Sequence, residues 1–587
     1  MQRLRPSADD RGAALIMVVL LGFVSILLVG TGLTVATSGL RQASSTQQSA
    51  SALDAAFAGV QDYVARINAD DTYATKYVNT ASTFTSGSGS TGTVGIDPAN
   101  PAFGTGTTGA AATWATVPGS GGAAKYRYEV DNSAYKTTGV VRLRATGVAG
   151  NRARSLLVSL RVRGFVDYSY FTDYEIQDPQ ISGAPVATCV KHVWEGRPVD
   201  CGGVPDIKFG ASDAVSGDVH SNDRMVICGA TFTGRLTTAY SGSPLYSTRN
   251  CTTVKTISNI TRADALPMPS TNASMETDAA CLYTGPTQIT YNADGTMTVV
   301  SPWTRYTAVA NNVGSNPSSC GSPAQLATPG GARVAQLDAD LLYVQNVPSV
   351  STDPNYRSAT TTPPGVQCID SNGALTSAGD GIGWSVSGSS GGTIRYPGAN
   401  EAPATTKFGV IDPTWNTTLP AYGCRNGDLY VKGTVTTQTT AASENYVYVT
   451  GDVRYSDSTT DVLGLVGQNA VFVWNPMTKV TDQPILTDTG REIDAAIVSV
   501  AHTFQVQNYD RGATRGTLTV FGSIAQKYRG PVAASFPDTG YTKAYSYDPL
   551  LKTVSPPKFL ASTATSFTVT RYAAVSAGFT PAGAPAS

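Results

Sequence analysis

Histidine is scarce in this 587-residue sequence, and the usual catalytic motifs are missing. The three histidines, His192, His220 and His502, are far apart in the chain, which argues against a histidine-rich metal site. There is no H-E-x-x-H motif, no phosphate-binding loop and no G-x-S-x-G motif, because Ser387 occupies the last glycine position in GWSVSG. These absences predict a protein without a cofactor or a metal and argue against an enzyme.

Charged residues are also sparse, and neither sign is in excess. Lysine and arginine number 41, aspartate and glutamate number 42, and charged residues make up 14% of the chain. A nucleic-acid-binding protein needs clustered basic side chains to neutralise phosphates, and no basic stripe is present. The composition therefore predicts no nucleic-acid partner. The 59 glycines and 28 tyrosines favour β-structure with many turns, and the length favours two or three domains.

Cysteine is absent from both ends of the chain, and all eight cysteines lie between residues 189 and 424. Their spacing is long and irregular and includes no C-x-x-C pair. The even number predicts up to four disulfides in an oxidising compartment, with buried free thiols as the alternative, and the pairing cannot be read from the spacing. The candidate disulfide residues are Cys189, Cys201, Cys228, Cys251, Cys281, Cys320, Cys368 and Cys424.

A long run without charge stands near the start of the chain. No charged residue occurs from residue 13 to residue 40, and the densest apolar part covers residues 13–29. A helix of this length can cross a hydrocarbon layer of ~30 Å, and the run is longer than the apolar region of a secretory signal. Arg3, Arg5 and Arg11 precede it, so the positive-inside rule places the N-terminus in the cytoplasm and the rest of the chain outside.

An amphipathic stretch continues directly from this run. Apolar residues recur there every three or four positions, which places them on one helical face. No proline interrupts residues 7–93, so the pattern predicts one continuous helix from Ala13 to Asn68, roughly 80 Å long, half in lipid and half packed on a domain. The residues of this face are Leu53, Ala56, Phe57, Val60, Tyr63, Val64 and Ile67.

Alternating strands follow after a Ser-, Thr- and Gly-rich stretch, residues 69–122, that is typical of an exposed loop. The segments KYRYEV (125–130), VRLRAT (141–146) and SLLVSLRVRG (155–164) predict an antiparallel sheet with one face in solvent, and GVAGN (147–151) supplies a turn. The apolar stripe of the helix is the candidate cover for the other face. The inward residues are Tyr126, Tyr128, Val130, Val141, Leu143, Ala145, Leu156, Val158, Leu160 and Val162.

A charged leader ending at Gly12, an apolar helix that begins at once and an amphipathic continuation resemble the class III signal of type IV pilins and pseudopilins. RGAALIMVVLL (11–21) looks like the N-terminus of PilX-type minor pilins, and RLRATGVAGNRARSLLVSLRV (142–162) resembles their sheet segment. The resemblance implies cleavage by a prepilin peptidase between Gly12 and Ala13, followed by methylation of Ala13. It also implies helix packing through Leu15, Met17, Leu53, Phe57, Val60 and Val64. An uncleaved signal anchor and an unrelated β-meander are the alternatives.

One position departs from the pattern of major pilins. These carry glutamate at the fifth mature position, which here is Met17, and a carboxylate in lipid needs a cation such as the N-terminal amine of a neighbouring subunit. Minor pilins that start or cap a filament can lack this glutamate. The departure argues against a major, repeating subunit.

The large remainder of the chain repeats short strands. Blocks at 216–239, 427–456, 462–474, 495–509 and 516–526 share an apolar-x-apolar pattern with glycine. The reference positions Gly433, Gly451, Gly467, Ala501 and Gly522 are 18, 16, 34 and 21 residues apart. This recurrence predicts the coils of a parallel β-helix or solenoid, and a β-sandwich is the alternative. The segment ITYNADGTMTVV (289–300), with Asp294 and Gly295, predicts a hairpin.

These patterns divide the chain and define its fold class. The prediction is an α+β pilin-like module, a long helix plus an antiparallel sheet, followed by a mainly β domain. The predicted segments are a leader (1–12), a transmembrane helix (13–40), a pilin-like helix and sheet (41–164), an extracytoplasmic β domain (165–560) with a cysteine-rich insertion at about 240–425, and a strand with a flexible tail (561–587).

Two further groups of residues are candidates for chemistry or binding. Asp213, Asp218 and Asp223, with Arg224, could act as paired carboxylates on a β-helix, although turn and surface aspartates are the plainer interpretation. The tryptophans could form sugar-binding platforms, although most are expected in the core. They are Trp114, Trp194, Trp303, Trp384, Trp415 and Trp474.

The sequence thus predicts a non-enzymatic minor pilin or pilin-like protein of the bacterial cytoplasmic membrane, with its N-terminus inside and its head outside. Its expected partners are the membrane, prepilin peptidase, other pilin subunits and a surface ligand, either a glycan or a protein. The head would serve adhesion or a tip function. The alternatives are a cell-envelope anchor without a pilus partner and a membrane-anchored carbohydrate-active enzyme.

Overall fold

The structure of the protein, a computed structural model, forms two compact units. It describes residues 10–70, 73–77, 97, 99–103, 114–133, 135, 139–162, 164–370, 374–376, 381–388, 392–402, 422–535, 538–560 and 567–586. Unit 1 comprises Met1–Ser133, Val141–Leu160 and Val569–Ser587. Unit 2 comprises Ala134–Val140 and Arg161–Thr568. The N-terminal long helix and the large, mainly β unit with several sheets agree with the coarse fold prediction.

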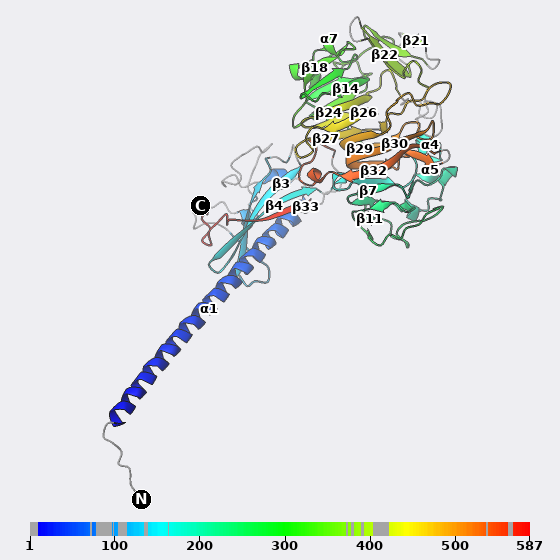
Figure 1. Ribbon diagram of the computed structural model, residues 1–587. Coiled ribbons are helices and arrows are strands. Elements are labelled where there is room, and N and C mark those ends of the chain that lie inside the picture. Colours follow the sequence, from blue (N-terminus) through cyan, green and yellow to red (C-terminus); the bar gives the residue numbers. More distant parts are fainter. Residues whose placement is uncertain are drawn as a thin grey trace. The chain divides into compact units, whose positions relative to one another are not determined.

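Helix α1 (Asp10–Ala69) dominates unit 1. It is one unbroken helix of 60 residues, about 90 Å long at 1.5 Å per residue, which confirms the prediction of a continuous helix. Its N-terminal part projects as a lone helix, and burial begins only at about residue 45 (Figure 1). The two halves of α1 therefore have different surroundings within one element.

The C-terminal half of α1 packs on a five-stranded sheet. The strand order is β1 (Ala115–Thr116), β2 (Ala124–Asp131), β3 (Val140–Ala149), β4 (Arg152–Val162) and β33 (Phe567–Val575). The pairs β1–β2 and β2–β3 are antiparallel, and the three predicted strands are confirmed, with only Gly150 and Asn151 left as the turn before β4. Much of the predicted loop at 69–122 lies outside the described residues. Its described helices are α2 (Tyr73–Lys76) and the 3₁₀ helix η1 (Pro101–Phe103).

The second face of this sheet is only partly in solvent: Arg142 is exposed as predicted, but the C-terminal residues, predicted to form a flexible tail, pack over part of the face. Arg127 and Glu129, which alternate with the helix-facing residues of β2, are only 2% and 1% exposed. The C-terminal residues cover them: the Arg127 guanidinium lies 3.8 Å from the centre of the Phe579 ring and donates to the Gly583 carbonyl at 3.1 Å. Gly578 N donates to Ser155 Oγ at 3.0 Å. The tail folds because it closes over polar groups that strand alternation leaves on the second face.

Unit 2 is built on ladders of parallel strands. One ladder pairs ten strands in register, each with the next. In spatial order they are β13 (Cys281–Thr284), β19 (Asp340–Gln345), β25 (Gln438–Ser443), β27 (Val462–Gly467), β29 (Arg491–Val506), β30 (Thr514–Tyr528), β5 (Tyr170–Tyr174), β8 (Val219–Ser221), β11 (Leu236–Thr238) and β12 (Ile260–Arg262).

Two more parallel ladders share some of these strands. The second joins β14 (Thr287–Tyr291), β24 (Leu429–Val435), β26 (Val447–Tyr455), β28 (Val471–Val473) and the end of β29. The third joins the ends of β24 and β26 to β29, β30, β32 (Asp538–Tyr547), β7 (Ala214–Ser216) and β10 (Thr231–Phe232). An immunoglobulin-like sandwich consists of antiparallel sheets, so this pairing does not match that alternative.

The spatial order of the strands differs from their order in the chain. Strand β5, the first of unit 2, lies between β30 and β8, so the chain enters the stack in its middle. In Figure 1 the colours run from green at β14 through yellow and orange to β32 and return to blue-green at β7 and β11. The chain must then cross from β12 to β13, which are at opposite ends of the first ladder.

The first ladder separates two sets of buried side chains. One column belongs to the main core and contains Leu342, Ala441, Leu465, Ile497, Ile524, Val219 and Leu236. The neighbouring column is covered by the crossing segment, in which Leu266 and Met275 are buried. Asn272 anchors this segment, because its backbone N donates to Gln468 Oε1 and its Nδ2 donates to the Ser443 carbonyl. The residues of that column are Tyr343, Ala442, Val466, Val498, Ala525 and Phe171.

The predicted insertion at about 240–425 is partly scaffold. Strands β12, β13, β14 and β19 fall within these bounds and belong to the ladders. What is added is the predicted hairpin of β14 and β15 (Thr296–Val300), extended by β18 (Ala332–Ala335), and a four-stranded antiparallel sheet. That sheet has the order β21 (Leu375–Thr376), β20 (Val366–Ile369), β22 (Gly383–Ser387) and β23 (Thr393–Tyr396).

The other elements in the described part of unit 2 are short. The helices are η3 (Phe165–Asp167), α4 (Pro179–Ser182), α5 (Val186–Cys189), η4 (Val193–Glu195), η5 (Cys201–Gly203), α6 (Ser274–Asp278), η6 (Ser318–Cys320), α7 (Pro323–Leu326) and η7 (Pro549–Lys552). The remaining strands are β6 (Lys208–Phe209), β9 (Val226–Ile227), β16 (Ala308–Ala310), β17 (Val313–Ser315) and β31 (Ala533–Ser535).

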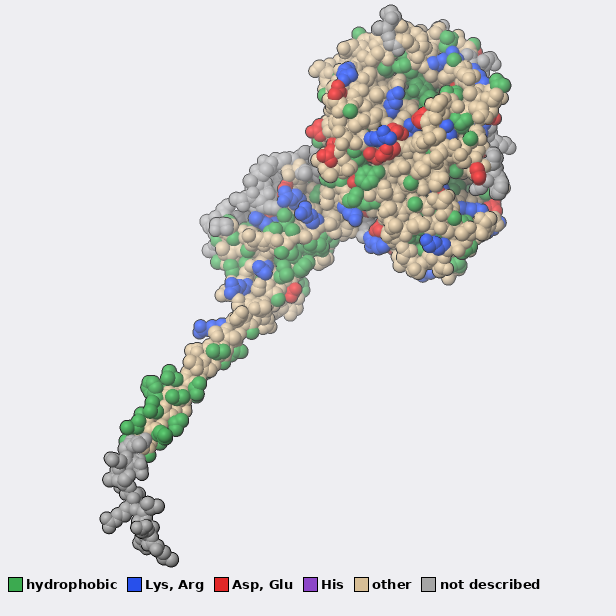
Figure 2. All heavy atoms as spheres, in the orientation of Figure 1, with side chains coloured by type: hydrophobic (Ala, Val, Ile, Leu, Met, Phe, Trp, Pro, Cys, Tyr) green, Lys and Arg blue, Asp and Glu red, His purple; other side chains and the backbone are tan. Residues whose placement is uncertain are grey.

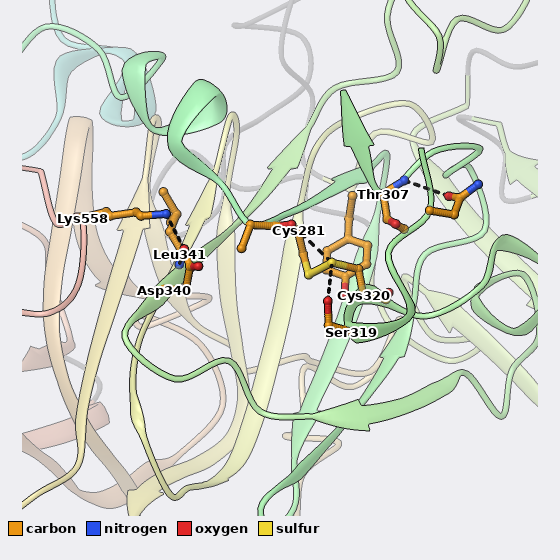
Figure 3. Close-up of a disulfide and its surroundings, with 10 residues drawn as sticks. Cys281, Thr307, Ser319, Cys320, Asp340, Leu341 and Lys558 are labelled. Atoms are coloured by element: carbon orange, nitrogen blue, oxygen red, sulfur yellow. Dashed lines mark hydrogen bonds and ion pairs between the residues drawn. A yellow bond between two sulfur atoms is a disulfide. The ribbon is translucent and has the colours of Figure 1, made fainter. Parts of the chain in front are cut away.

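All eight cysteines form disulfides, which confirms the upper limit that the sequence set. Each cysteine pairs with the next one in the chain: Cys189–Cys201, Cys228–Cys251, Cys281–Cys320 and Cys368–Cys424. Figure 3 shows Cys281–Cys320, which ties β13 to η6, beside the ion pair of Lys558 Nζ with Asp340 Oδ1 at 2.5 Å. The four bonds close successive loops of unit 2.

Candidate functional site

The N-terminal half of α1 is the most unusual surface of the protein. Its large apolar side chains are almost fully bare, with Leu15 67% and Met17 69% exposed, and the same holds along the helix to Leu40. Figure 2 shows them as a hydrophobic band. The helix is long and apolar enough to cross a membrane, by length and composition. An exposed apolar surface of this extent is typical of contact with lipid or with other proteins.

The polar residues in this half are compatible with an apolar surrounding. Ser25 Oγ donates to the Leu21 carbonyl at 2.7 Å, and Thr31 Oγ1 donates to the Leu27 carbonyl at 2.8 Å. Thr34, Thr37 and Ser38 make the same kind of bond one turn back. Because the helix itself satisfies these hydroxyls, they need no water.

The start of the helix carries the predicted processing site. Gly12 and Ala13 lie within α1, whose first residue is Asp10, and the exposure of these two residues is outside the described part. Met17, the fifth residue after the predicted cleavage point, carries an uncharged thioether. The apolar surface is therefore free of charge from residue 14 to residue 40.

The C-terminal half of α1 packs through smaller residues than the sequence suggested. Val60, Tyr63 and Ile67 are fully buried, as predicted, but Leu53 and Val64 are half-buried, and Phe57 is 39% exposed. Phe57 instead contacts Tyr572 of β33, with ring centroids 5.7 Å apart. Ala56 is also fully buried, as predicted, and the buried face further contains Ala52, Ala55 and Gly59.

Small residues are required there because helix and sheet backbones come very close. A Cβ added at Gly147 of β3 would lie 2.1 Å from the Ala52 carbonyl oxygen and 2.3 Å from Ala56 N. At Gly59 it would lie 3.0 Å from Tyr126 Cδ2. A periodic apolar pattern favours large side chains at a helix–sheet contact, so it missed this close approach.

Polar and aromatic contacts orient the same half of the helix. The Tyr128 hydroxyl donates to Asp62 Oδ2 at 2.8 Å, and Arg66 Nε pairs with the same oxygen at 2.9 Å. Burial raises the pKa of Tyr128, so its hydroxyl stays protonated and able to donate. The rings of Tyr63 and Tyr128 are 5.3 Å apart, edge to face, and Phe103 lies 5.1 Å from Tyr128. These contacts fix the rotation of α1 on the sheet.

The aspartates considered for catalysis are all engaged in ion pairs. Asp223 is fully buried, pairs with Arg197 and accepts from Val193 N at 3.0 Å. Asp213 pairs with Lys543 at 2.7 Å. Asp218 pairs with Arg235 at 2.6 Å; burial acts to raise its pKa, but the hydrogen bonds from Arg235 outweigh it and lower the pKa below 3.8. This pattern is that of structural ion pairs. Arg224 lies over the Tyr240 ring, 5.3 Å from its centre.

The three histidines each have their own polar or aromatic contacts. His220 is fully buried and bonds to Thr237 and Asn222. His502 bonds to Asp178, and His192 is stacked between Tyr174 and Trp194, at 4.4 and 4.3 Å. Among the described residues no group of three or more histidine, cysteine or acidic side chains could hold a metal ion.

The tryptophans separate into core and surface positions. Trp303 and Trp384 are fully buried, whereas Trp194 is 42% exposed and Trp474 is half-buried. Trp114 is half-buried in unit 1, and Trp415 lies outside the described residues. Only Trp194 and Trp474 therefore remain candidates for a binding surface among the described tryptophans of unit 2.

Comparisons with known proteins add little. No protein-family model and no curated protein matches the sequence. Among solved structures, the chain is similar to the competence-associated pilin ComZ from Thermus thermophilus, at 11% identity and a TM-score of 0.27, with 90% of this chain and 97% of that chain covered. A TM-score at this level is too low to establish a common fold.

Proposed function

We propose that the protein is a minor pilin or pilin-like subunit of a type IV pilus or pseudopilus. In this role prepilin peptidase removes residues 1–12, Ala13 becomes the methylated N-terminus, and the apolar half of α1 stays in the bacterial cytoplasmic membrane until it joins the helices of other pilin subunits. The N-terminus faces the cytoplasm, and both units beyond residue 40 lie outside. The PilX-like sequence pattern supports the assignment to minor pilins.

The single observation that carries this proposal is the division of α1. One half is bare and apolar, with its hydroxyls satisfied internally, and the other half is packed on a small sheet in the same unbroken helix. A plain membrane anchor needs the first feature alone. A helix that must hold a folded module at a defined distance from a bundle of other helices needs both.

We further propose that unit 2 is a parallel β-solenoid that serves adhesion or a tip function without catalysis. The three parallel ladders support the solenoid, as does a column of asparagines at one corner, where Asn469 N donates to the Asn445 carbonyl and His502 N to the Asn469 carbonyl. Structural ion pairs at Asp213, Asp218 and Asp223 favour a binding role over hydrolysis.

Cysteine scanning in the native membrane tests the assembly role. Every native cysteine is in a disulfide, so a single cysteine introduced at each position from Leu15 to Val29 reports only its own neighbours. We expect a photoreactive benzophenone attached to the introduced cysteine to cross-link to other pilin subunits at positions that recur every three or four residues, because such positions share one face of the helix. Phe57→Cys, an exposed position of the packed half, is the control and is expected to give no such product.

A chain that serves only as an envelope anchor would give a different result. It would yield no cross-link to another pilin subunit at any of the scanned positions. That outcome would contradict the assembly role.

A further inference from the structure

Unit 2 has a surface pocket among its described residues. It has a volume of about 260 Å³ and is lined by residues of β14 and β23 and of the segment after β28. The side chains that matter for its chemistry are Gln288, Arg395, Tyr396, Glu401, Trp474 and Ile485. The volume is just below the range of about 300–1,000 Å³ typical of small-molecule sites, so it suits a compact ligand.

Aromatic rings form one wall of the pocket and are held rigidly. Tyr396 stacks on Tyr430, with ring centroids 4.1 Å apart, and Trp474 meets Tyr396 edge on at 5.7 Å. The indole Nε1 of Trp474 donates to the Tyr422 hydroxyl at 2.9 Å. A ligand that stacks on this wall therefore needs to order no side chain, which favours binding.

A carboxyl group is fixed beside these rings. Glu401 is 1% exposed, and its Oε1 accepts from the Tyr422 hydroxyl at 2.8 Å. Its Oε2 accepts from Gly398 N, also at 2.8 Å. Burial raises the pKa of Glu401 to about 7, which hydrogen bonds from Gly398 and Tyr422 oppose. The group is thus poised between an acceptor and a neutral donor of hydrogen bonds.

Gln288 supplies a polar group that the fold does not use. Its Oε1 is buried and has no hydrogen-bond partner among the described residues. A buried acceptor without a donor is costly, and such groups in native proteins call for an explanation. A ligand hydroxyl donating to Oε1 would satisfy it.

The position of Gln288 makes this amide more unusual. It is in register with Tyr430, Tyr448 and Phe472 of the successive strands β24, β26 and β28. Those three rings stack along the ladder at 5.0 and 5.6 Å. The four side chains in register therefore consist of three aromatic rings followed by an amide at the pocket. An apolar side chain at position 288 would have continued the stacking.

We propose that this pocket binds a neutral sugar ring of a glycan. The apolar C–H face of the ring would lie on Tyr396 and Trp474, and its hydroxyls would donate to Gln288 Oε1 and exchange hydrogen bonds with Glu401 and Arg395. The Glu401 carboxylate would repel an anionic ligand, and the Arg395 guanidinium would repel a cationic one. These two side chains together therefore favour a neutral ligand. This proposal names a ligand for the surface-binding role of unit 2, and that role is the one part of the proposed function on which it rests.

Saturation-transfer NMR on the full chain tests the proposal. The chain is solubilised in a detergent whose head group contains no sugar, and the probes are trisaccharides of glucose, galactose, mannose and N-acetylglucosamine. We expect saturation transfer to the ring protons of at least one probe. The proposal would be overturned if none of the four trisaccharides bound at a concentration of about 10 mM, which corresponds to a binding free energy weaker than about −3 kcal/mol.

Three variants locate the site. Gln288→Leu replaces the amide, including its unpartnered acceptor, with an apolar side chain of similar size, so it is expected not to lower the unfolding temperature while weakening sugar binding by about tenfold or more. Trp474→Ala is expected to abolish binding. Trp194→Ala, the matched control at an exposed tryptophan elsewhere on unit 2, is expected to leave it unchanged.

The opposite pattern, with binding lost in Trp194→Ala and retained in Gln288→Leu and Trp474→Ala, contradicts the proposal. The measurement does not depend on N-terminal processing or on filament assembly. A failure of sugar binding is therefore distinguishable from a failure of the pilin assignment.

Discussion

Unit 1 and unit 2 are stabilised by different interactions. Unit 1 has no cysteine and is held by close packing of α1 on a small sheet, with the C-terminal residues over the other face. Unit 2 contains all four disulfides, three parallel ladders and buried ion pairs such as Arg529 with Glu175 at 2.7 Å.

The difference teaches where each unit is vulnerable. Unit 1 joins chain segments that are 423 residues apart, as in the bond from Gly578 to Ser155, and it depends on backbones that nearly touch. Unit 2 is cross-linked within loops whose ends are 12 to 56 residues apart in sequence. Unit 1 should therefore be sensitive to added side-chain volume, and unit 2 to reductant.

The largest expected effect is on unit 2 when all four disulfides are reduced. A bond such as Cys281–Cys320, which spans 39 residues, contributes about 3–4 kcal/mol in the chain-entropy treatment, and the four together exceed the stability of most domains. Hydrogen exchange followed by mass spectrometry should show fast exchange throughout unit 2 and unchanged exchange in unit 1. Equal acceleration in both units would contradict the comparison.

The next largest effect should be confined to unit 1. Gly147→Ala places a Cβ 2.1 Å from the Ala52 carbonyl oxygen, so the backbones of α1 and β3 must separate, at a cost of about 3 kcal/mol or more in unfolding free energy. Gly39→Ala is the matched control, because nothing lies within 4 Å of its added Cβ and alanine favours a helix. Hydrogen exchange of unit 1 peptides measures both, and similar values for the two variants would refute the close-packing argument.

A smaller, pH-dependent effect is expected in unit 2. Burial raises the pKa of Glu401 from 4.5 to about 7, so the folded state holds a proton that the unfolded state has already lost. The stability of unit 2 should therefore fall as pH rises from about 4.5 to 7, by on the order of 3 kcal/mol from this group.

Glu401→Gln isolates that contribution. Denaturant unfolding at pH 5 and pH 8 should show a smaller loss of stability in this variant than in the unchanged chain. Burial raises the pKa of Asp494 to about 6, so this group changes the stability with pH in the same direction. Asp494→Asn is therefore the comparison that shows its share of the pH dependence of the unfolding free energy. An unchanged slope in Glu401→Gln would rule out the proposed protonation of this carboxyl.

The smallest effect separates two faces of α1. Phe57 is partly exposed, and Tyr572 is the one aromatic ring in contact with it among the described residues, so Phe57→Ala should cost about 1 kcal/mol. Val60→Ala, at a fully buried position, should cost about 2 kcal/mol although it removes fewer atoms. Thermal unfolding of unit 1 measures which variant loses more stability. A larger loss in Phe57→Ala than in Val60→Ala would support the buried face predicted from the sequence.

Much of this organisation could be predicted from local patterns. The continuous helix, the strands at 125–130 and 141–146, and the hairpin around Asp294 and Gly295 depend on neighbours within a few residues, which the sequence displays directly. The number of disulfides followed from the even count of cysteines.

Other features depend on contacts between distant segments and left no local signal. The tail after residue 575 is rich in small residues, so nothing in its own composition indicates that it closes over Arg127. The insertion of β5 between β30 and β8 cannot be seen in a repeat, because periodicity records the order of strands in the chain and not in space. The pocket combines β14 with β23, about 100 residues later, for the same reason.

The most direct test of the central claim is the mass of the N-terminal peptide of the protein isolated from its native membrane. The account predicts a chain that begins at Ala13 and carries one added methyl group, because a prepilin peptidase cuts after Gly12 and leaves α1 intact. A chain that still begins at Met1, or one that lacks its first forty residues, would contradict it.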